Sequence, residues 1–338
     1  MRDQIDEEPY ASAARALQKR AEAALALEPQ SVTAVGGVPE SGDVHDFSTA
    51  PPYAHPEGTR DGVVNPKADR ADYSAVVALS QAVRDLAPAH AVTGQARYAQ
   101  KALTLIRFWC LDPETRMNPR FTNHQSQIEL SISVPALFYG ASVLWDDPGW
   151  TSEEKEAFWT WAEAFRESGE GWTKENNFEN WRLVFLASAA ALLGDEAALQ
   201  DVFAAWKGLL DRQVAKDGSL PHELSRAGSL GYSTYALNAM VQTAEIARHH
   251  GADLYGYVSP KGRSLEQVLA FHAPYVIDPA AWPYKQIKPY KGENGALYEV
   301  AHAATGHPLY LRVVQHLGRP LYESRVMGPV TLTHGEAE

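Results

Sequence analysis

The chain has 338 residues, of which 45% are hydrophobic and 21% are charged, as in an ordinary soluble globular protein of one or two domains. Lysine and arginine number 30 against 42 aspartates and glutamates, and the resulting net charge of −12 argues against a general nucleic-acid-binding protein. If the partner is an anionic small molecule or oligosaccharide, the positive charge that binds it must be local.

The single cysteine, Cys110, cannot form a disulfide within the chain, and we expect it to be a small buried side chain. The amino-terminal sequence is acidic and amphipathic and has no apolar h-region, so we expect no signal peptide. No apolar run approaches the ~20 residues that span a bilayer. The sequence therefore predicts a cytoplasmic protein with no membrane partner, and it leaves the oligomeric state open.

Residues 1–30 are predicted to form an amino-terminal helix, because alanine and leucine recur at spacings of three and four between Tyr10 and Leu27. Residues 31–70 form a long irregular segment rich in Pro, Gly, Asp and Ser. A loop of this length in a compact protein is either functional or disordered. Its aromatic residues and histidines favour function, and we expect it to lie over a cleft.

From Tyr73 onward, helical periodicity dominates the sequence. Thr151 and Asp195 are predicted to cap helix N-termini, and Gly194 and Gly251 to end helices. The pattern predicts helices over residues 74–93, 96–111, 127–145, 152–168, 177–194, 196–214, 232–250, 264–276 and 295–306. Residues 309–317 fit a helix or a strand, and no strand hairpin is predicted.

About ten or more antiparallel helices in succession fit either a helical bundle or an (α/α) toroid, which is an incomplete α/α barrel. Short helix–loop–helix units favour the toroid. The pattern continues without a linker. The predicted fold class is therefore all-α, and residues 1–338 are predicted to form a single domain.

Three polar clusters are candidates for a functional site. The first, NHQSQIELS, places His124, Gln125 and Gln127 just ahead of an apolar helix. A helix N-terminus needs one capping side chain, so the others are candidate ligand contacts. Capping alone stays an alternative.

The second cluster, ENNFENW, places Asn176 and Asn177 together at a predicted helix start. Asparagine is a poor helix former, so several at this position favour a specific role. One can cap the helix, while another can offer its amide NH2 to a carboxylate or carbonyl. Phe178 and Trp181 are expected to be core residues or a surface on which a sugar stacks.

The third cluster, DGSLPHELSRAGSLGYSTYALNAM, places His222 next to Glu223, and Arg226 six residues before Tyr232. An arginine close to a tyrosine favours the phenolate, which makes the tyrosine easier to use as a base. The alternative is that Tyr232 and Tyr235 are aromatic core residues of a helix.

Other catalytic signatures are absent from the sequence. It contains no dinucleotide-binding glycine motif, Walker A motif, HExxH motif or GxSxG motif. The residues of GDVHDF fit no standard metal site, and His249 and His250 fit favourable charges at a helix C-terminus. We therefore expect no metal and no cofactor.

The sequence resembles the alginate lyase-like family of α/α-toroid polysaccharide lyases over residues 31–314. The strings that carry the resemblance are SVTAVGGVPESGDVHDFSTAPPY, RDGVVNP, YAQKALTLIRFWCLDPETRMNP, SQIELSISVPALFYGASVLW, NNFENWRLV, DGSLPHELSRAGSLGYSTYALNAM and WPYKQI. The resemblance implies β-elimination on a uronic acid. A base removes the C5 proton, hydrogen bonds neutralise the neighbouring carboxylate, and the 4-O-glycosidic bond breaks to leave an unsaturated sugar.

Typical members of the family use an NNH motif, an arginine and a tyrosine in an HY motif. By position, Asn176, Asn177 and Phe178 match NNH, Arg226 matches the arginine, and Gly231 with Tyr232 matches HY. Both histidines of the family pattern are thus replaced. The paired tryptophans that usually follow the PY of the long loop are also missing, which removes a stacking platform for a polymer.

The resemblance therefore predicts a lyase acting on a uronate-containing glycan or oligosaccharide, with a non-standard active site. The predicted catalytic residues are Tyr232, Arg226, Asn177, His124 and His222. The predicted substrate-binding residues are Asn176, Gln125, Gln127, Phe178, Trp181, Tyr235, Tyr53, Trp282 and Lys285. Two alternatives stay open: a toroid recruited to an elimination or related acid–base reaction on a small secondary-metabolite-like substrate, and a non-catalytic glycan-binding relative.

Overall fold

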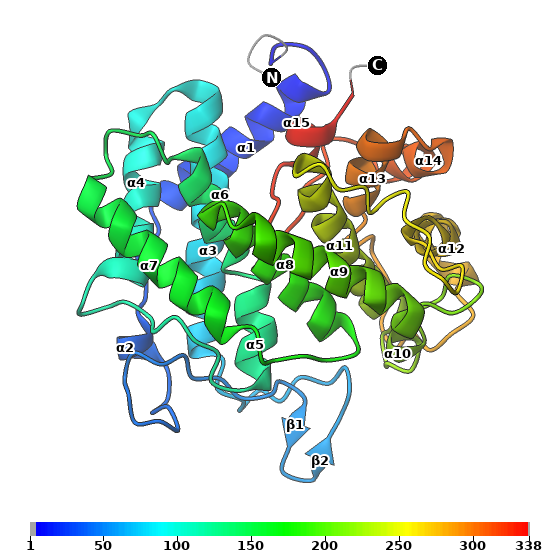
Figure 1. Ribbon diagram of the computed structural model, residues 1–338, viewed down its shortest axis with the longest axis horizontal. Helices are drawn as coiled ribbons and strands as arrows, with labels where there is room; N and C mark the ends of the chain where they lie inside the picture. The colour runs from blue at the N-terminus through cyan, green and yellow to red at the C-terminus, as the bar shows by residue number, and fades with distance from the viewer. Residues whose placement is uncertain (1–4, 337–338) are drawn as a thin grey trace.

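The structure is a computed structural model that describes residues 5–336, and helices make up most of it (Figure 1). The longer helices are α1 (Tyr10–Leu25), α3 (Ala71–Thr93), α4 (Ala96–Ile106), α5 (His124–Ser131), α6 (Pro135–Val143), α7 (Ser152–Ser168), α8 (Asn177–Leu193), α9 (Glu196–Gln213), α11 (Ser229–His249), α12 (Leu265–Ile277), α13 (Leu297–Thr305) and α14 (Pro308–Leu317). Short helices are α2 (Val32–Val35), α10 (Pro221–Leu224) and α15 (Val330–His334). The predicted all-α class is confirmed, and the helices form an (α/α) toroid. Among these described helices, none is long and apolar enough to cross a membrane.

The segment between α2 and α3 contains a small hairpin that sequence reasoning did not predict. Strands β1 (Ala54–His55) and β2 (Gly58–Thr59) pair antiparallel, with Ala54 opposite Thr59. Two-residue strands are too short to show an alternating pattern, which explains why the sequence gave no signal. The hairpin projects from the lower edge of the helical body (Figure 1).

The predicted helix over residues 127–145 is in fact two helices. α5 ends at Ser131, and α6 begins at Pro135, which occupies the first turn. Proline has no N–H to donate to the preceding turn, so it starts a helix more easily than it continues one. Asn123 caps α5 by accepting a hydrogen bond from the backbone N–H of Ser126.

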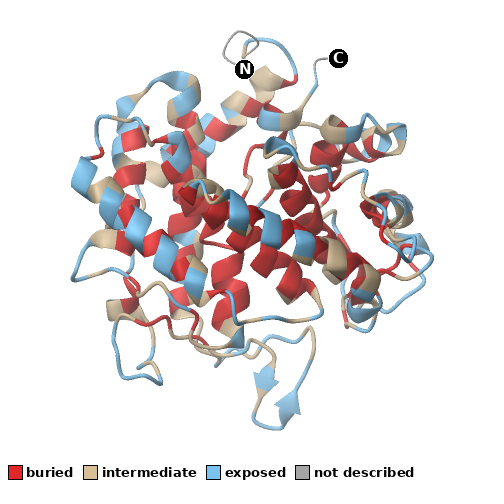
Figure 2. Cartoon of the chain, viewed as in Figure 1, coloured by how far each residue is buried: buried red, intermediate tan, exposed pale blue. Residues whose placement is uncertain are grey.

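Helices α8 and α11 lie at the centre of the molecule, and buried residues follow them along most of their length (Figure 2). Cys110 is buried, as expected. A Cβ added at Gly140 of α6 would lie 2.3 Å from Val83 of α3, so glycine permits these two helices to pack closely. Residues 309–317, left open between helix and strand, lie in helix α14.

Candidate active site

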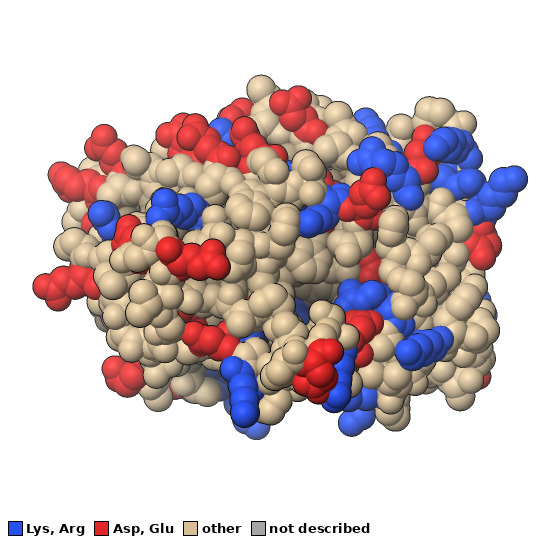
Figure 3. All heavy atoms as spheres, turned by 90° about the horizontal axis from the view of Figure 1, so that it is seen from below, with Lys and Arg blue, Asp and Glu red and all other residues tan. Residues whose placement is uncertain are grey.

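A pocket of about 460 Å³ opens on the face where the hairpin segment and the N-terminal ends of α5, α8 and α11 come together. Seen from below, this face is hollowed near its centre, with basic side chains at the edge of the hollow (Figure 3). The pocket is lined by Pro52, Tyr53, Gly62, Arg70, Tyr73, Gln125, Ile128, Glu129, Ile132, Asn177, Phe178, Arg226, Gly228, Gly231, Tyr232, Tyr235, Gln286, Ile287, Lys288, Pro289, Tyr290, Glu293, Asn294 and Arg325.

The two adjacent asparagines at the start of α8 have different positions and contacts. Asn176 is the N-cap, and its side chain accepts a hydrogen bond from the backbone N–H of Phe178 at 3.1 Å. Asn177 lines the pocket, and both its backbone N–H and its Nδ2 donate to the carboxylate of Glu223 at 2.8 Å. The second amide hydrogen and the Oδ1 of Asn177 have no partner in residues 5–336, so they are available to a ligand.

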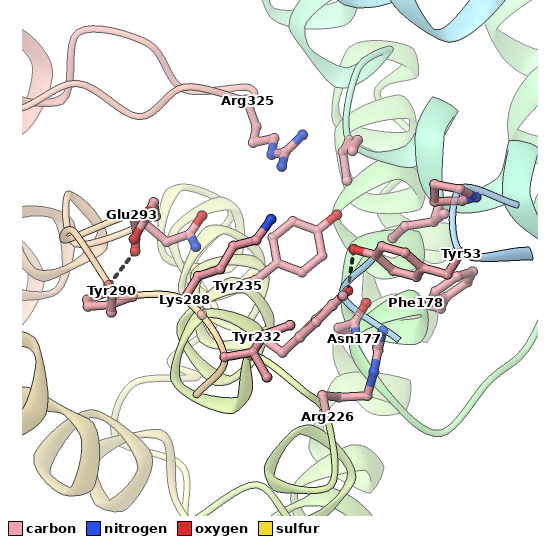
Figure 4. A pocket seen from close by; sticks show the side chains of 18 of the residues that line it. Tyr53, Asn177, Phe178, Arg226, Tyr232, Tyr235, Lys288, Tyr290, Glu293 and Arg325 are labelled. Carbon is pink, nitrogen blue, oxygen red and sulfur yellow. Dashed lines mark hydrogen bonds between the residues drawn. The ribbon is translucent and has the colours of Figure 1, made fainter. Parts of the chain in front are cut away.

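Glu223, on the short helix α10, is almost completely buried beneath Asn177. Burial raises the pKa of Glu223 to about 7, although the two hydrogen bonds from Asn177 oppose this shift. The carboxylate fixes the orientation of the Asn177 amide, because that amide must keep an N–H directed at Glu223. Phe178 lies beside Asn177 on the pocket wall and contributes an apolar surface there (Figure 4).

Arg226 is held between an acid and an aromatic ring. Its guanidinium donates through Nε and Nη2 to Asp61 of the loop before α3, with a shortest distance of 2.6 Å. The same guanidinium lies 3.7 Å from the centre of the Tyr232 ring. Burial alone would raise the pKa of Asp61, but hydrogen bonds from Arg226 and from the backbone of Ala227 outweigh it and lower the pKa.

Tyr232 lies in the first turn of α11, and its hydroxyl donates to the hydroxyl of Tyr53 at 2.8 Å (Figure 4). Burial raises the pKa of Tyr232, and the hydrogen bond with Tyr53 raises it further, while Arg226 acts in the opposite direction. The expectation that Arg226 favours the phenolate is thus right for that one contact, but burial outweighs it. The free phenol is protonated at neutral pH.

Tyr235 lies one helical turn beyond Tyr232 on α11, and its ring contacts two other side chains. Its ring packs against Trp181, with ring centres 5.0 Å apart, and the guanidinium of Arg325 lies 5.3 Å from its centre. Nη1 of Arg325 donates to the hydroxyl of Tyr73 at 3.1 Å. Tyr235 therefore lines the pocket on one side and reaches the core on the other.

A second buried carboxylate lies on the α5 side of the pocket. Glu129 pairs with Arg70 and accepts a hydrogen bond from Nε2 of Gln125 at 2.7 Å. Burial raises the pKa of Glu129 to about 7, against the opposing effect of Arg70. Gln125 is thus in the pocket, with its amide NH2 engaged by Glu129.

The two histidines predicted as catalytic do not line the pocket. His124, at the first position of α5, is exposed and packs edge-on against Trp172 with ring centres 5.2 Å apart. His222, on α10, is also exposed. Neighbouring residues in sequence diverge here because adjacent positions on a helix point in different directions, so that Glu223 faces inward while His222 faces solvent.

Several predicted substrate-binding residues also have structural positions outside the pocket. Gln127 is buried and donates to the carbonyl oxygen of Trp172, and Trp181 is fully buried in the core. Trp282 is buried and donates to Ser229, while the backbone carbonyl of Lys285 accepts from Ser229 and its side chain is exposed. These two residues anchor the loop that precedes the pocket-lining residues 286–290. Asn176, as the cap of α8, does not line the pocket either.

The pocket also contains residues that sequence reasoning did not single out. They are Arg70, Tyr73, Glu129, Gln286, Lys288, Tyr290, Glu293 and Arg325. Glu129 stood inside the first polar cluster and could have been included. Lys288 closely follows the WPYKQI string, whereas Arg325 belongs to no motif. The lining contains four basic and two acidic side chains, which is the local positive charge that an anionic ligand requires on this acidic chain.

Residues 5–336 contain no group of three or more His, Cys, Asp or Glu side chains arranged to hold a metal ion. The chemistry that the pocket offers is that of phenols, amides, guanidinium groups and carboxylates. Such groups can bind a carboxylate and move a proton.

The fold is an α/α toroid, and the pocket at the N-terminal ends of its central helices is cationic and lined by tyrosines. Comparison with known proteins identifies the family to which such a protein belongs. The model of the alginate lyase family matches residues 31–282, and the chain belongs to this family of polysaccharide lyases. The family resemblance inferred from the sequence is thereby confirmed. No curated protein matches the sequence.

Solved structures of alginate lyases share the fold. An alginate lyase from Bacteroides ovatus is 26% identical, with a TM-score of 0.89 over 100% of this chain and 96% of that chain. Alginate lyase A1-III from Sphingomonas species A1 is 20% identical, with a TM-score of 0.68 over 96% of this chain and 93% of that chain. Two variants of A1-III, in which a histidine or a tyrosine is replaced, have structures with a bound tetrasaccharide.

Proposed function

We propose that this protein cleaves a uronate-containing polysaccharide or oligosaccharide by β-elimination, with Tyr232 as both base and acid. The observation that carries the proposal is the position of the Tyr232 hydroxyl. It lies in a cationic pocket, hydrogen-bonded to Tyr53, on a ring covered by Arg226. Membership of the alginate lyase family supports the reaction class.

The first requirement of this reaction is to make the C5 proton acidic, which demands that the charge developing on the neighbouring carboxylate be stabilised. Asn177 can donate its second amide hydrogen to that carboxylate, in an orientation fixed by Glu223. Arg226 has Nη1 left for the same task, because Asp61 engages its Nε and Nη2. Both groups are in place before substrate binds, which is the condition under which hydrogen bonds lower a barrier most.

The second requirement is a group that removes the C5 proton and one that protonates the leaving oxygen. With His124 and His222 away from the pocket and Phe178 on its wall, Tyr232 is the candidate for both. The Tyr232 phenolate takes the C5 proton, the electron pair forms the C4–C5 double bond, and the C4–O4 bond breaks. The leaving oxygen then takes the proton back from Tyr232, so that the phenolate is regenerated.

A phenolate must exist for this cycle to start, although burial keeps Tyr232 protonated at neutral pH. The hydrogen bond from Tyr232 leads to Tyr53, which lies on the partly exposed hairpin segment and connects it to solvent. Arg226 against the ring stabilises the phenolate once it forms. The active fraction is therefore small at pH 7 and grows with pH.

The test is the ultraviolet absorbance of the conjugated unsaturated uronate, which intact sugars lack. The wild-type protein is incubated with a panel of uronate polymers and tetrasaccharides, and with the same sugars after reduction of their carboxyl groups. We expect absorbance to rise with at least one uronate and with none of the reduced sugars. No rise on any uronate, from protein shown to be folded, would refute the proposal.

A further inference from the structure

Asn177 lies between the pocket and the buried carboxylate of Glu223. Its backbone N–H and its Nδ2 donate at 2.8 Å to Oε1 and Oε2 of Glu223, which is only 2% exposed. Both oxygens of this carboxylate are therefore engaged by one residue of α8. The rest of the Asn177 amide, one N–H and the Oδ1 atom, has no partner among residues 5–336 and is left for a ligand in the pocket.

What the Asn177 amide presents to the pocket depends on whether Glu223 carries a proton. An ionised carboxylate only accepts hydrogen bonds, whereas a protonated one also donates one. While Glu223 is ionised, Asn177 must direct an N–H at it and presents one N–H and one acceptor oxygen to the pocket. Once Glu223 is protonated, its O–H can donate to Oδ1 after the amide turns by about 180°, a rotation that leaves the shape of the side chain nearly unchanged. Asn177 then presents both hydrogens of its NH2 group to the pocket.

A uronate carboxylate distinguishes between these two states of the amide. It is ionised at neutral pH and only accepts hydrogen bonds, so it favours the state with two N–H groups and opposes the state with Oδ1. It also brings a second negative charge, because two oxygens that accept from one amide nitrogen lie ~5 Å apart. Even at the dielectric constant of water, the repulsion of two unit charges at ~5 Å changes an equilibrium constant about fourfold. Binding of the anion therefore favours a proton on Glu223.

The other groups that face Glu223 do not remove this repulsion. Arg226 and Asp61 pair with each other at 2.6 Å, so that their opposite effects on Glu223 largely cancel. Tyr235 of α11 stays neutral because burial raises its pKa, and the neighbouring His222 is exposed. Burial raises the pKa of Glu223 itself to about 7, so a small further rise changes its protonation at neutral pH.

We propose that Glu223 is a positioning residue that takes up a proton when a uronate carboxylate binds to Asn177, and that this proton turns the Asn177 amide so that its NH2 group faces the ligand. The proton comes from solvent and returns to it when the ligand leaves. The inference rests on the proposed function only for the position of the uronate carboxylate at Asn177. It makes the affinity for a uronate dependent on pH, in contrast to the affinity for a neutral sugar.

The test counts the protons that accompany binding of a saturated tetrauronate, by calorimetry in buffers of different ionisation enthalpy. Tyr232→Phe is the parent protein, so that no turnover occurs. Near about pH 7 we expect Glu223 to take up about 0.3 proton per tetrauronate, the amount that a fourfold coupling gives at its midpoint. Glu223→Gln should remove this uptake. Glu129→Gln should keep it, because Glu129 is the other pocket carboxylate with a pKa of about 7 but contacts Gln125 and not Asn177.

Affinity separates this role from a merely structural one. In Glu223→Gln the new amide can donate to Oδ1 of Asn177 at every pH, as protonated Glu223 does. This variant should bind the tetrauronate as tightly as its parent at about pH 6 and about fourfold more tightly at about pH 8.5. Glu223→Met also removes the charge but offers no donor, so it should bind about fivefold more weakly than Glu223→Gln. The carboxyl-reduced tetrasaccharide should cause no proton uptake at Glu223, because it brings no negative charge.

Four results would overturn the inference. They are a proton uptake in Glu223→Gln equal to that of its parent, weaker binding by Glu223→Gln than by its parent at both pH values, equal binding by Glu223→Gln and Glu223→Met, and no binding of the tetrauronate at all. The second result would leave Glu223 with a structural role, and the third would show that its charge acts without the turn of the amide.

The failure of the proposed function gives a different pattern. If wild-type protein forms no unsaturated uronate but the tetrauronate binds with proton uptake that depends on Glu223, elimination is refuted and the coupling stands. If unsaturated uronate forms but binding causes no proton uptake at Glu223, the coupling is refuted and elimination stands.

Discussion

Replacement of Tyr232 by phenylalanine tests the central element of the proposed mechanism. The change removes one oxygen atom and leaves the ring beneath Arg226, so the packing around it is preserved. The lost hydrogen bond to Tyr53 lowers the free energy of unfolding by about 1 kcal/mol, which the fold tolerates. The lost proton carrier costs about 10²–10⁴ in rate, because among residues 5–336 no other side chain hydrogen-bonds to the Tyr53 hydroxyl.

Tyr53→Phe supplies the comparison that separates chemistry from hydrogen bonding. It removes the same hydrogen bond but keeps the Tyr232 hydroxyl, so kcat/KM should fall about fivefold, the equivalent of about 1 kcal/mol. Initial rates from ultraviolet absorbance give kcat/KM for both variants. If Tyr232→Phe stays within tenfold of wild type, or if the two variants lose the same activity, Tyr232 is not the acid and base.

Three further predictions follow from burial and charge. Because the base must be ionised and burial raises the pKa of Tyr232, kcat/KM should rise about tenfold per pH unit between about pH 7 and pH 9, and a flat profile would exclude the phenolate. The pKa of Glu223 is raised from 4.5 to about 7, so its contribution to the free energy of unfolding is complete below pH 4.5 and is lost as the pH rises through 7. In the wild-type protein this loss lowers the free energy of unfolding by about 3 kcal/mol, and Glu223→Gln should abolish the decrease. Urea titrations of the two proteins across this pH range measure the difference. Trp181→Ala should lower the free energy of unfolding by about 3–5 kcal/mol, because this side chain is fully buried, and a loss below 1 kcal/mol in the same titrations would contradict its position in the core.

The helices were predictable because their signals are local. Thr151 and Asp195 cap α7 and α9 as expected, and Gly194 ends α8 in the left-handed conformation that glycine adopts without strain. Pro135 was passed over because the apolar run on both sides continued the periodicity, yet a proline at the first turn starts a new helix. The two strands of the hairpin between Ala54 and Thr59 contain only four paired residues, which is too few to show an alternating pattern in the sequence.

The predicted residues that line the pocket all stand in a polar cluster or in a motif of the family resemblance. Asn177, Arg226 and Tyr232 were found by the resemblance, and all three line the pocket. His124 and His222 were chosen because each stands in one of the polar clusters, but the direction of a side chain depends on the turn of its helix and on packing. Tyr53 of the long loop was also predicted and lines the pocket, whereas Arg325, which reaches the pocket from a loop near the end of the chain, belongs to no motif and had no sequence signal.

The basic side chains that line the pocket differ in whether they are paired with a carboxylate. Arg226 is paired with Asp61 and presents little net charge, whereas Lys288 and Arg325 have no ion pair with any residue between 5 and 336. Lys288 and Arg325 both lie beyond residue 282, where the match to the family model ends. On the proposed function, the groups that act on the sugar lie within the matched region and these two cations lie outside it. If the proposed function holds, substitution of Lys288 or Arg325 should therefore change how tightly an anionic substrate binds while the groups around Tyr232 stay the same.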